Sequence, residues 1–354
     1  MKYSNNNQFK KTIYYYTWNT QFPLLPLIIK DIKDNKPERI VFCDFEEYEY
    51  PWNYPELIDE LNKLINKFNI EFIITLGSEK TNFFLDCFSS NIKCKNLHFP
   101  LFWLYKTYSH LDDMNAFSLH EEIYIDKLFI SLNNLRREHR YLLMDKLCEY
   151  DLLNYGYISW LQFGDEIDYK LKCWKEKQII LDKKRIKTQE DQCNVPLEYK
   201  KVFVNIISES TTETLFLTEK TFISILLKQP FLILGSKNIH QLLKKYGFQL
   251  YDEIFDYSFD DLLVVEDRID GIIKNLLKIK DKNYTHLREL IENKIQFNFN
   301  HAINIVENKL FIPDNIKDIL NELNFNFERG ISAKCLKGFL FQGYQKQKNI
   351  NKII

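Results

Sequence analysis

The residues best suited to chemistry are hydroxyl, carboxylate and ammonium side chains that follow one apolar run of strand length. The run is residues 202–207, and the side chains after it belong to Ser208, Glu209, Ser210, Thr218, Glu219 and Lys220. Thr218 suits the N-cap of a helix, whose free N–H groups and positive dipole end attract an anion. A lysine in the first helical turn opposes the dipole preference, so Lys220 is best explained if it faces an anion such as a diphosphate. Glu219 can accept hydrogen bonds from ribose hydroxyls, although a helix cap beside a solvated Lys220 is the simpler alternative.

A second group of anion-binding side chains follows the apolar run at residues 127–132. It is basic, and its members are Arg136, Arg137, His139 and Arg140. Arginine offers forked N–H donors that match phosphate oxygens, so a strand end followed by three arginines predicts an anion site. Arg136 is the first candidate and Arg140 the second. The two share a face if a helix begins here. His139 is expected to be a capping or surface residue.

The elements that must position these residues alternate between strand and helix, which predicts an α/β layer architecture. The predicted strands are residues 12–18, 39–45, 70–76, 127–132, 202–207 and 231–234. The predicted helices are residues 55–68, 137–147, 218–227 and 239–246, with Gly247 as a C-terminal cap, and a mostly helical stretch over 258–309. Residues 160–194 are polar and charged and are expected to form a loop. Because ligands bind at the carboxyl ends of strands in open α/β sheets, the two polar groups are expected on neighbouring strand ends.

The length of 354 residues suggests two domains. The pattern of strands and helices favours two Rossmann-like halves with a boundary near residue 126. We therefore expect an N-terminal domain at 1–126, a C-terminal domain at 127–330 and a tail at 331–354.

Composition narrows the class of protein. Lys and Arg total 48 against 49 Asp and Glu, so the chain lacks the basic excess typical of proteins that bind nucleic acid through its phosphates. The seven cysteines are scattered without the spacing of a zinc site, which predicts reduced thiols in a cytoplasmic compartment. Residues 1–11 are polar and predict no secretory signal, and the apolar run at 23–29 is too short to span a membrane.

Three segments carry a resemblance to a known family. They are Phe-Val-Asn-Ile-Ile-Ser-Glu-Ser at 203–210, Leu-Thr-Glu-Lys-Thr-Phe at 217–222 and Gln-Pro-Phe-Leu-Ile-Leu-Gly-Ser at 229–236. Together they resemble the donor-site motif of α1,3-fucosyltransferase-like enzymes and of related uncharacterised glycosyltransferases of large viruses and phages. The resemblance continues through Asp267-Arg268 and covers roughly residues 127–305. One departure is that the family's Glu-Asn-Ser appears here as Glu209-Ser210, which puts the role of that Asn in doubt.

The resemblance implies a GT-B fold, in which two Rossmann-like domains face each other and the C-terminal one holds a GDP- or UDP-linked sugar. Glu219 would then bind the ribose, and Lys220 and Arg136 the diphosphate. Such enzymes need no metal cofactor, because protein cations and helix dipoles stabilise the leaving diphosphate. The sequence shows adjacent acid pairs at 112–113 and 260–261 instead of a D-x-D motif, and both pairs are expected on the surface.

The catalytic base is expected in the N-terminal domain. Sugar transfer with inversion needs a group that takes the proton of the acceptor hydroxyl. The predicted strand at 39–45 is followed by carboxylates and then by Trp52 and Tyr54, whose rings suit a sugar-binding cleft. Asp44 and Glu46 are the candidates, and a charged loop that happens to contain aromatic residues is an equal alternative.

The sequence thus predicts a cytoplasmic, metal-independent, inverting glycosyltransferase that moves a hexosyl or pentosyl group from a nucleotide sugar to a glycan. If the source is viral, the location is the host cytoplasm. The first alternative is transfer to a hydroxymethylated DNA base, against which the neutral overall charge argues mildly. The second is a non-catalytic protein that binds a nucleotide sugar or a glycan. An NAD-type oxidoreductase is disfavoured because no G-x-G-x-x-G follows the early strands.

Overall fold

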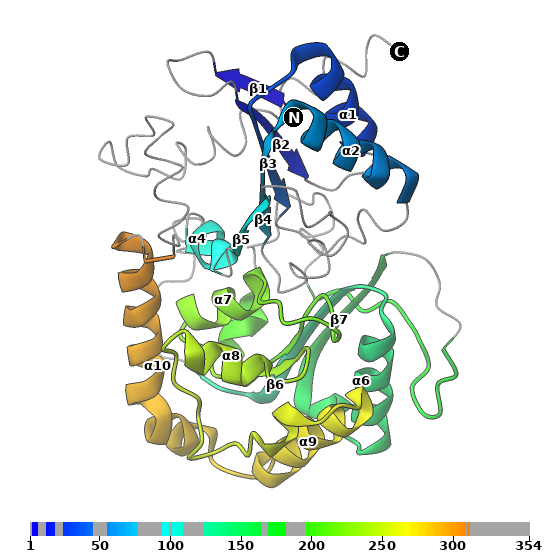
Figure 1. Cartoon of the computed structure of the whole chain (residues 1–354). Helices are drawn as coiled ribbons and strands as arrows, with labels where there is room; N and C mark the ends of the chain where they lie inside the picture. Colours follow the sequence, from blue (N-terminus) through cyan, green and yellow to red (C-terminus); the bar gives the residue numbers. More distant parts are fainter. Residues whose placement is uncertain are drawn as a thin grey trace. The chain divides into compact units, whose positions relative to one another are not determined.

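A computed structural model describes residues 2–5, 12–17, 24–44, 55–76, 94–98, 101–108, 124–163, 169–181, 196–308 and 310–311. The chain divides into two compact units, one made of Met1–Phe102 with Lys309–Ile354 and the other of Trp103–Asn308. Each unit contains one sheet with parallel strands, so the chain is a mixed α/β protein as the sequence predicts (Figure 1). The predicted boundary near residue 126 immediately precedes the first strand of the second sheet. The functional division at that boundary stays a prediction.

The first unit contains a five-stranded sheet in the order β1-β2-β3-β4-β5. Its strands are β1 (Lys2–Asn5), β2 (Thr12–Thr17), β3 (Arg39–Asp44), β4 (Glu71–Leu76) and β5 (Cys94–His98). β1 is antiparallel to β2, and all other neighbours are parallel. The three strands that the sequence predicts in this unit are confirmed to within one residue at each end.

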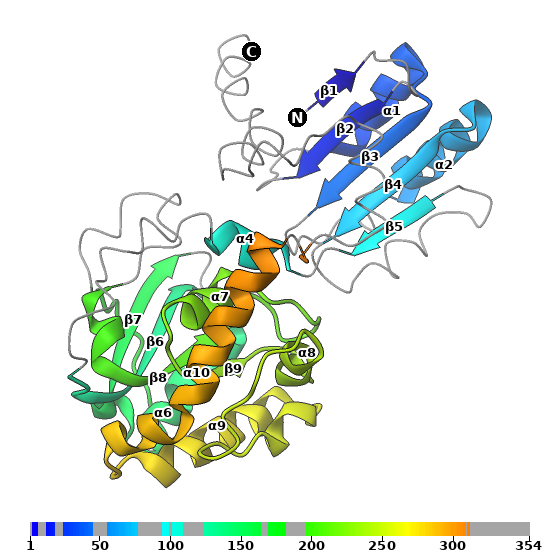
Figure 2. The same ribbon diagram turned by 90° about the vertical axis from the view of Figure 1, so that its left-hand side faces the viewer.

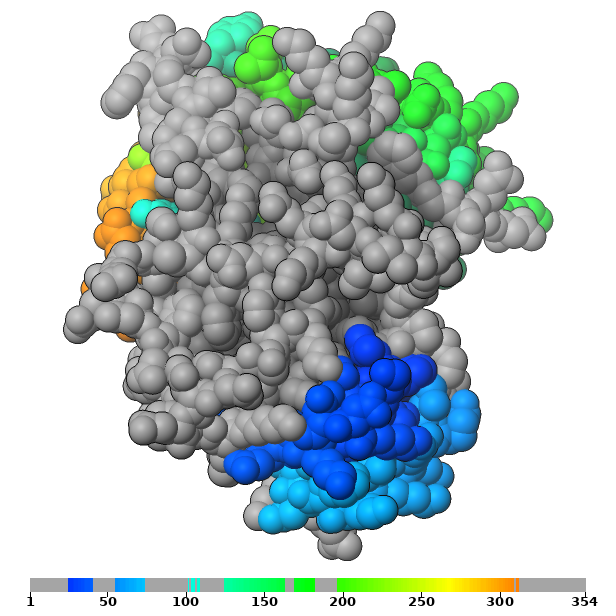
Figure 3. Space-filling model, turned by 90° about the horizontal axis from the view of Figure 1, so that it is seen from above, coloured from blue at the N-terminus to red at the C-terminus, as the bar shows by residue number. Residues whose placement is uncertain are grey.

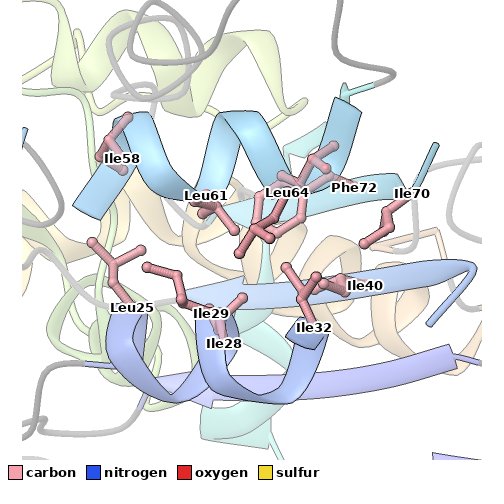
Figure 4. Close-up of a cluster of buried hydrophobic side chains, with 11 residues drawn as sticks. Leu25, Ile28, Ile29, Ile32, Ile40, Ile58, Leu61, Leu64, Ile70 and Phe72 are labelled. Carbon is pink, nitrogen blue, oxygen red and sulfur yellow. The ribbon is translucent and has the colours of Figure 1, made fainter. Parts of the chain in front are cut away.

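Two helices build the core of the first unit, α1 (Leu24–Asn35) and α2 (Pro55–Phe68). Their buried leucine and isoleucine side chains point toward one another, toward Ile40 of β3 and Phe72 of β4, and toward Ile70 immediately before β4 (Figure 4). Figure 3 shows the outer surface of these two helices in blue. At the strand starts, the guanidinium of Arg39 donates to Glu71 at 2.8 Å in a buried ion pair. That pair fixes the register of β3 against β4.

The second unit contains a four-stranded sheet in the order β7-β6-β8-β9, with all neighbours parallel (Figure 2). Its strands are β6 (Lys127–Leu135), β7 (Gly156–Phe163), β8 (Val202–Ser208) and β9 (Phe231–Leu234). Every residue of β8 and β9 is buried, which requires cover on both faces of the sheet. Strands covered on both faces are continuously apolar, and this is why the sequence identifies β8 and β9 correctly.

Helices connect and cover these strands. They are α6 (Glu138–Glu149), α7 (Glu219–Leu226), α8 (Ile239–Lys245), α9 (Val265–Ile279) and α10 (Tyr284–Glu307), with short 3₁₀ turns at Leu153–Tyr155, Leu197–Lys201 and Ser258–Asp261. A further helix, α4 (Phe102–Tyr108), precedes these strands in the sequence. α6 packs against α9, and α7 packs against α10 (Figures 1 and 2). The predicted cap of α8 is confirmed. Gly247 has a φ of 87° and donates to Lys244 O, while Phe248 donates to Leu243 O, which is a Schellman motif.

Two expectations about the segment after α6 are wrong. Residues 160–163 belong to β7 instead of a loop. This segment pairs with β6 as an edge strand, although it contains the polar residues Ser159 and Gln162. Cys148 on α6 is joined to Cys173 in a disulfide with Cα atoms 5.9 Å apart, so the prediction of reduced thiols fails for this pair. The pair is 25 residues apart and forms no local motif that the sequence reveals.

Within the described ranges, no helix is both long and apolar enough to cross a bilayer. The predicted tail at 331–354 lies outside those ranges.

Candidate functional site

A pocket of about 640 Å³ opens beyond the carboxyl ends of β6 and β8, within the second unit. The start of α6 contributes Arg136, Arg137, Glu138 and His139, the loop after β8 contributes residues 210–213, and α9 contributes Val265 and Glu266. This is the edge of a parallel sheet at which ligands bind, because loops and helix N-termini meet there. The location matches the strand ends that the sequence indicates.

The two polar groups found in the sequence are brought together because β6 and β8 are neighbouring parallel strands. Arg140 is 3% exposed, and its guanidinium donates to Leu135 O at 2.9 Å, Ser208 O at 3.2 Å and Glu209 O at 3.3 Å. Arg140 therefore joins the end of β6 to the end of β8. The predicted adjacency of the two strand ends is confirmed. The contacts of Arg140 favour a positioning role over direct contact with a ligand.

Glu209 is a buried anchor for the start of α7. Its side chain is fully buried, and its carboxylate accepts hydrogen bonds from Thr218 N at 3.1 Å, from Thr221 Oγ1 at 2.7 Å and from the hydroxyl of Thr218. Thr218 is the N-cap of α7, as predicted, and accepts from Lys220 N. Ser208 is buried with its hydroxyl unpartnered among the described residues. The side chains of Glu209 and Thr218 hold the loop and the helix start in place.

Lys220 lies next to the pocket wall. Its ammonium is 3.1 Å from Thr218 Oγ1, 3.2 Å from Glu219 Oε1 and 3.4 Å from the Oγ of Ser210, which lines the pocket. The Lys220 side chain is 28% exposed and that of Glu219 is 13% exposed. An ammonium group has three donors and a flexible stem, so Lys220 can exchange the carboxylate of Glu219 for a ligand oxygen.

Arg136 lines the pocket and is held rigidly by groups that the sequence did not indicate. Its Nε donates to Glu176 Oε1 at 3.0 Å, and its Nη1 donates to Gln162 O at 3.0 Å. Trp160 Nε1 donates to the same Glu176 oxygen at 2.9 Å. The hydrogen bond that Arg136 donates to Glu176 raises the pKa of Arg136 above its ordinary value. The guanidinium is thereby fixed in orientation at the end of β6.

His139 is buried, so the expectation of a capping or surface residue is wrong. It lies in the first turn of α6, is 7% exposed and lines the pocket. Its Nε2 is 3.0 Å from Glu209 O. A carbonyl only accepts, so Nε2 carries the proton. Burial, together with the positive charges of Arg140, Arg137 and Lys220, lowers the pKa of His139 to about 3, which keeps the ring neutral.

Several further charged groups shape the pocket and were not singled out from the sequence as site residues. Glu138, Glu213 and Glu266 line it beside the arginines. Arg268 on α9 is 3% exposed and donates to Leu262 O at 2.7 Å, Leu263 O at 2.9 Å and Thr212 O at 3.3 Å. Arg268 thus ties the loop after β8 to the segment before α9. Its only signal in the sequence is that Asp267-Arg268 extends the resemblance to the fucosyltransferase-like motif.

The candidate base lies largely outside what the structure describes. Asp44 is the last residue of β3 in the first unit, but its side chain is outside the described part, as is the whole of Glu46. The expectation for Asp260 is wrong, because this residue is 2% exposed and accepts from His240 Nδ1 at 2.7 Å and from the backbone N–H groups at the start of α8. It is a helix-capping acid. Among the described residues, no cluster of His, Cys, Asp and Glu has the arrangement of a metal site.

Comparison with known proteins finds similarity to solved structures. No protein-family model matches the chain, and no curated protein matches it. A solved structure entitled "Crystal Structure of alpha1,3-Fucosyltransferase" aligns with 88% of this chain and 95% of its own, at 11% identity and a TM-score of 0.39. A TM-score of this size does not establish a shared fold, so the chemistry must be argued from the pocket itself.

Proposed function

We propose that the chain is a glycosyltransferase that binds a nucleotide sugar in the pocket at the start of α6 and transfers its sugar to a glycan. The observation that carries the proposal is the mixed charge of the pocket. Arg136 and Arg137 line it together with Glu138, Glu213 and Glu266. A nucleotide sugar carries a diphosphate for the guanidinium groups and many hydroxyls for the carboxylates. A purely anionic ligand would face three carboxylates, and a neutral sugar would bring no anion to the positively charged side of the pocket.

The proposed diphosphate site combines Arg136 with Lys220. Arg136 is oriented by Glu176 and Gln162, and Lys220 lies at the capped start of α7, where helix N–H groups favour an anion. Both cations stabilise the negative charge that develops on the diphosphate as the bond to the sugar breaks. Because these groups supply that stabilisation, transfer without a metal ion is part of the proposal. Glu219, beside Lys220, is proposed to bind the ribose.

The acceptor side is proposed to lie in the N-terminal domain, within a GT-B arrangement. Asp44, at the carboxyl end of β3, and the nearby Glu46 are the proposed bases that take the proton of the acceptor hydroxyl. Direct attack of that hydroxyl on the anomeric carbon would invert its configuration. The step is balanced in protons and in charge. The base gains the proton of the hydroxyl, and the nucleoside diphosphate leaves with the electron pair of its bond to the anomeric carbon.

A thermal-shift screen followed by a hydrolysis assay tests the proposal. We expect GDP- or UDP-linked sugars to raise the melting temperature, since a ligand at about 100 times its Kd stabilises a protein by roughly 2.7 kcal/mol. The ligands that bind are then followed for release of nucleoside diphosphate, with and without EDTA, in the wild type and in Asp44→Asn and Glu46→Gln variants. The variant that lacks the base should keep the thermal shift and lose turnover by about 100-fold or more.

Other outcomes would reject parts of the proposal. If no nucleotide or nucleotide sugar raises the melting temperature, donor binding is wrong. Binding without any turnover in the wild type, with glycan acceptors present, would indicate a non-catalytic nucleotide-sugar protein. Loss of turnover in EDTA that a divalent cation restores would reject metal independence.

A further inference from the structure

His139 occupies a position that the diphosphate site does not explain. It is the neutral side chain between the charged residues at the start of α6, and its ring lines the pocket. Its Nε2–H is used by Glu209 O, at 3.0 Å. The ring has no second hydrogen-bond partner among the described residues. The ring of His139 is more than nine-tenths buried, and its Nε2 is already hydrogen-bonded. Its Nδ1 is therefore the ring nitrogen that can bond to a ligand in the pocket.

The hydrogen-bonding character of Nδ1 follows from the contact at Nε2. A neutral imidazole has one N–H donor and one lone-pair acceptor. Since the proton resides on Nε2 to meet the Glu209 carbonyl, Nδ1 is the acceptor. The nearby charges of Arg140 and Lys220 oppose a second proton, so the ring stays an acceptor at neutral pH.

We propose that Nδ1 of His139 accepts a hydrogen bond from a hydroxyl group of the bound nucleotide sugar and thereby selects ligands that carry a hydroxyl beside the diphosphate. This inference rests on the proposed function and deepens it. Arginine side chains recognise phosphate oxygens on any nucleotide, so they give affinity with little selectivity. A buried acceptor left unpaired by the wrong ligand gives selectivity, because desolvation without a replacement bond opposes binding.

The ligand donor has two possible sources, a ribose hydroxyl and a hydroxyl of the transferred sugar. UDP and GDP contain only the first, whereas UDP- and GDP-linked sugars contain both. Three sets of ligands separate the two sources. They are UDP or GDP, the matching 2′-deoxy and 3′-deoxy diphosphates, and nucleotide sugars with a fluorine in place of one hydroxyl. Fluorine keeps nearly the size of the hydroxyl and removes its proton.

The variants separate recognition from folding. In His139→Gln the side-chain NH₂ can still reach Glu209 O, but the acceptor at the Nδ1 position is lost. His139→Ala removes both functions, so the difference between His139→Ala and His139→Gln measures the structural role of the contact with Glu209 O. His286→Gln, on the exposed face of α10, is the matched control, because that histidine is solvated and remote in the sequence from the pocket residues.

Isothermal titration calorimetry of the full chain measures the affinity for each of these ligands and thereby tests the role of Nδ1. We expect His139→Gln to weaken binding of the complete nucleotide sugar by about three- to tenfold at an unchanged melting temperature. One hydroxyl replacement should weaken wild-type binding by the same factor and have no further effect in His139→Gln. If the wild type loses affinity for the deoxy diphosphates, the ribose is the source of the donor. If it loses affinity only for the fluorinated nucleotide sugars, the source is the transferred sugar.

Wild-type affinity for every replaced ligand within twofold of the parent would overturn the proposal, whether or not the variants fold. So would His139→Gln binding equal to wild type. Failure of the proposed function looks different, because the wild type would then bind no nucleotide at all.

Discussion

The side chains at the pocket divide into those that line it and can meet a ligand and those that hold others in place. Arg136 and His139 line the pocket, whereas Arg140 and Glu209 are buried behind it and bond to backbone and hydroxyl groups. The sequence indicated all four side chains but not this division. Residue type and spacing predict what a group can bind. Its burial depends on which strands become neighbours.

Glu176 shows why part of the site escaped prediction. It is 40 residues from Arg136, in a charged segment that the sequence presents as a loop, and no local pattern links the two. The pairing of β7 with β6 brings Trp160 close to the end of β6, and a backbone bridge between Trp160 and Ile179 places Glu176 beside it. Contacts between distant segments depend on the tertiary fold and therefore leave no mark in a short motif.

The buried, neutral His139 predicts acid sensitivity of the fold. Its pKa is lowered to about 3 in the folded protein, against an ordinary value of 6.5. Between these values the unfolded chain binds a proton that the folded chain does not. The contribution of His139 is therefore complete above about pH 6.5 and is lost as the pH falls toward 3, with a slope of up to about 1.4 kcal/mol per pH unit.

Urea denaturation at several pH values between about 6 and 4 measures this slope. We expect His139→Gln, which cannot titrate, to show a smaller fall in the free energy of unfolding than the wild type. His286→Gln should follow the wild type. Equal slopes for His139→Gln and the wild type would show that His139 is not held neutral.

At the scale of elements, the buried apolar strands of the second sheet were predictable and the less apolar β7 was not. β8 and β9 are buried throughout, and their short runs rich in Val, Ile and Phe favour strands over helices. β7 begins at Gly156, whose lack of a side chain is required because an added Cβ would lie 2.3 Å from the Phe129 ring. The need for glycine at position 156 becomes visible only when the adjacent ring of Phe129 on β6 is known, so the sequence alone does not indicate the strand.

The start of α7 gives the prediction at this scale. Thr218 caps the helix and donates to the buried carboxylate of Glu209. We expect Thr218→Ala to lower the free energy of unfolding by about 1 to 3 kcal/mol, because it removes a cap and leaves a buried carboxylate with one donor fewer. Thr218→Ser keeps the hydroxyl and should lose less than half as much in urea denaturation. Equal losses for the two variants would show that the hydroxyl contributes nothing.

At the scale of the whole molecule, the pocket depends on segments that are distant in sequence and adjacent in the second sheet. β6 delivers Arg136, and β8 leads to Lys220. A parallel sheet places their carboxyl ends at one edge, so the order β7-β6-β8-β9 is what unites the two motifs. The sequence predicted this convergence because both motifs follow strand-like runs. The acceptor side was not predictable to the same degree, since Asp44 and Glu46 follow a strand without a specific motif.

The measurement that tests the central claim most directly is the affinity of Arg136→Ala and Lys220→Ala for nucleoside diphosphates and for the corresponding nucleosides. If the two cations bind a diphosphate, each change should weaken UDP or GDP binding by about 10- to 100-fold and leave uridine or guanosine binding unchanged. Lys244→Ala, an exposed lysine on α8, should behave as wild type. Undiminished diphosphate binding, or an equal loss for the nucleoside, would contradict a diphosphate site at this sheet edge.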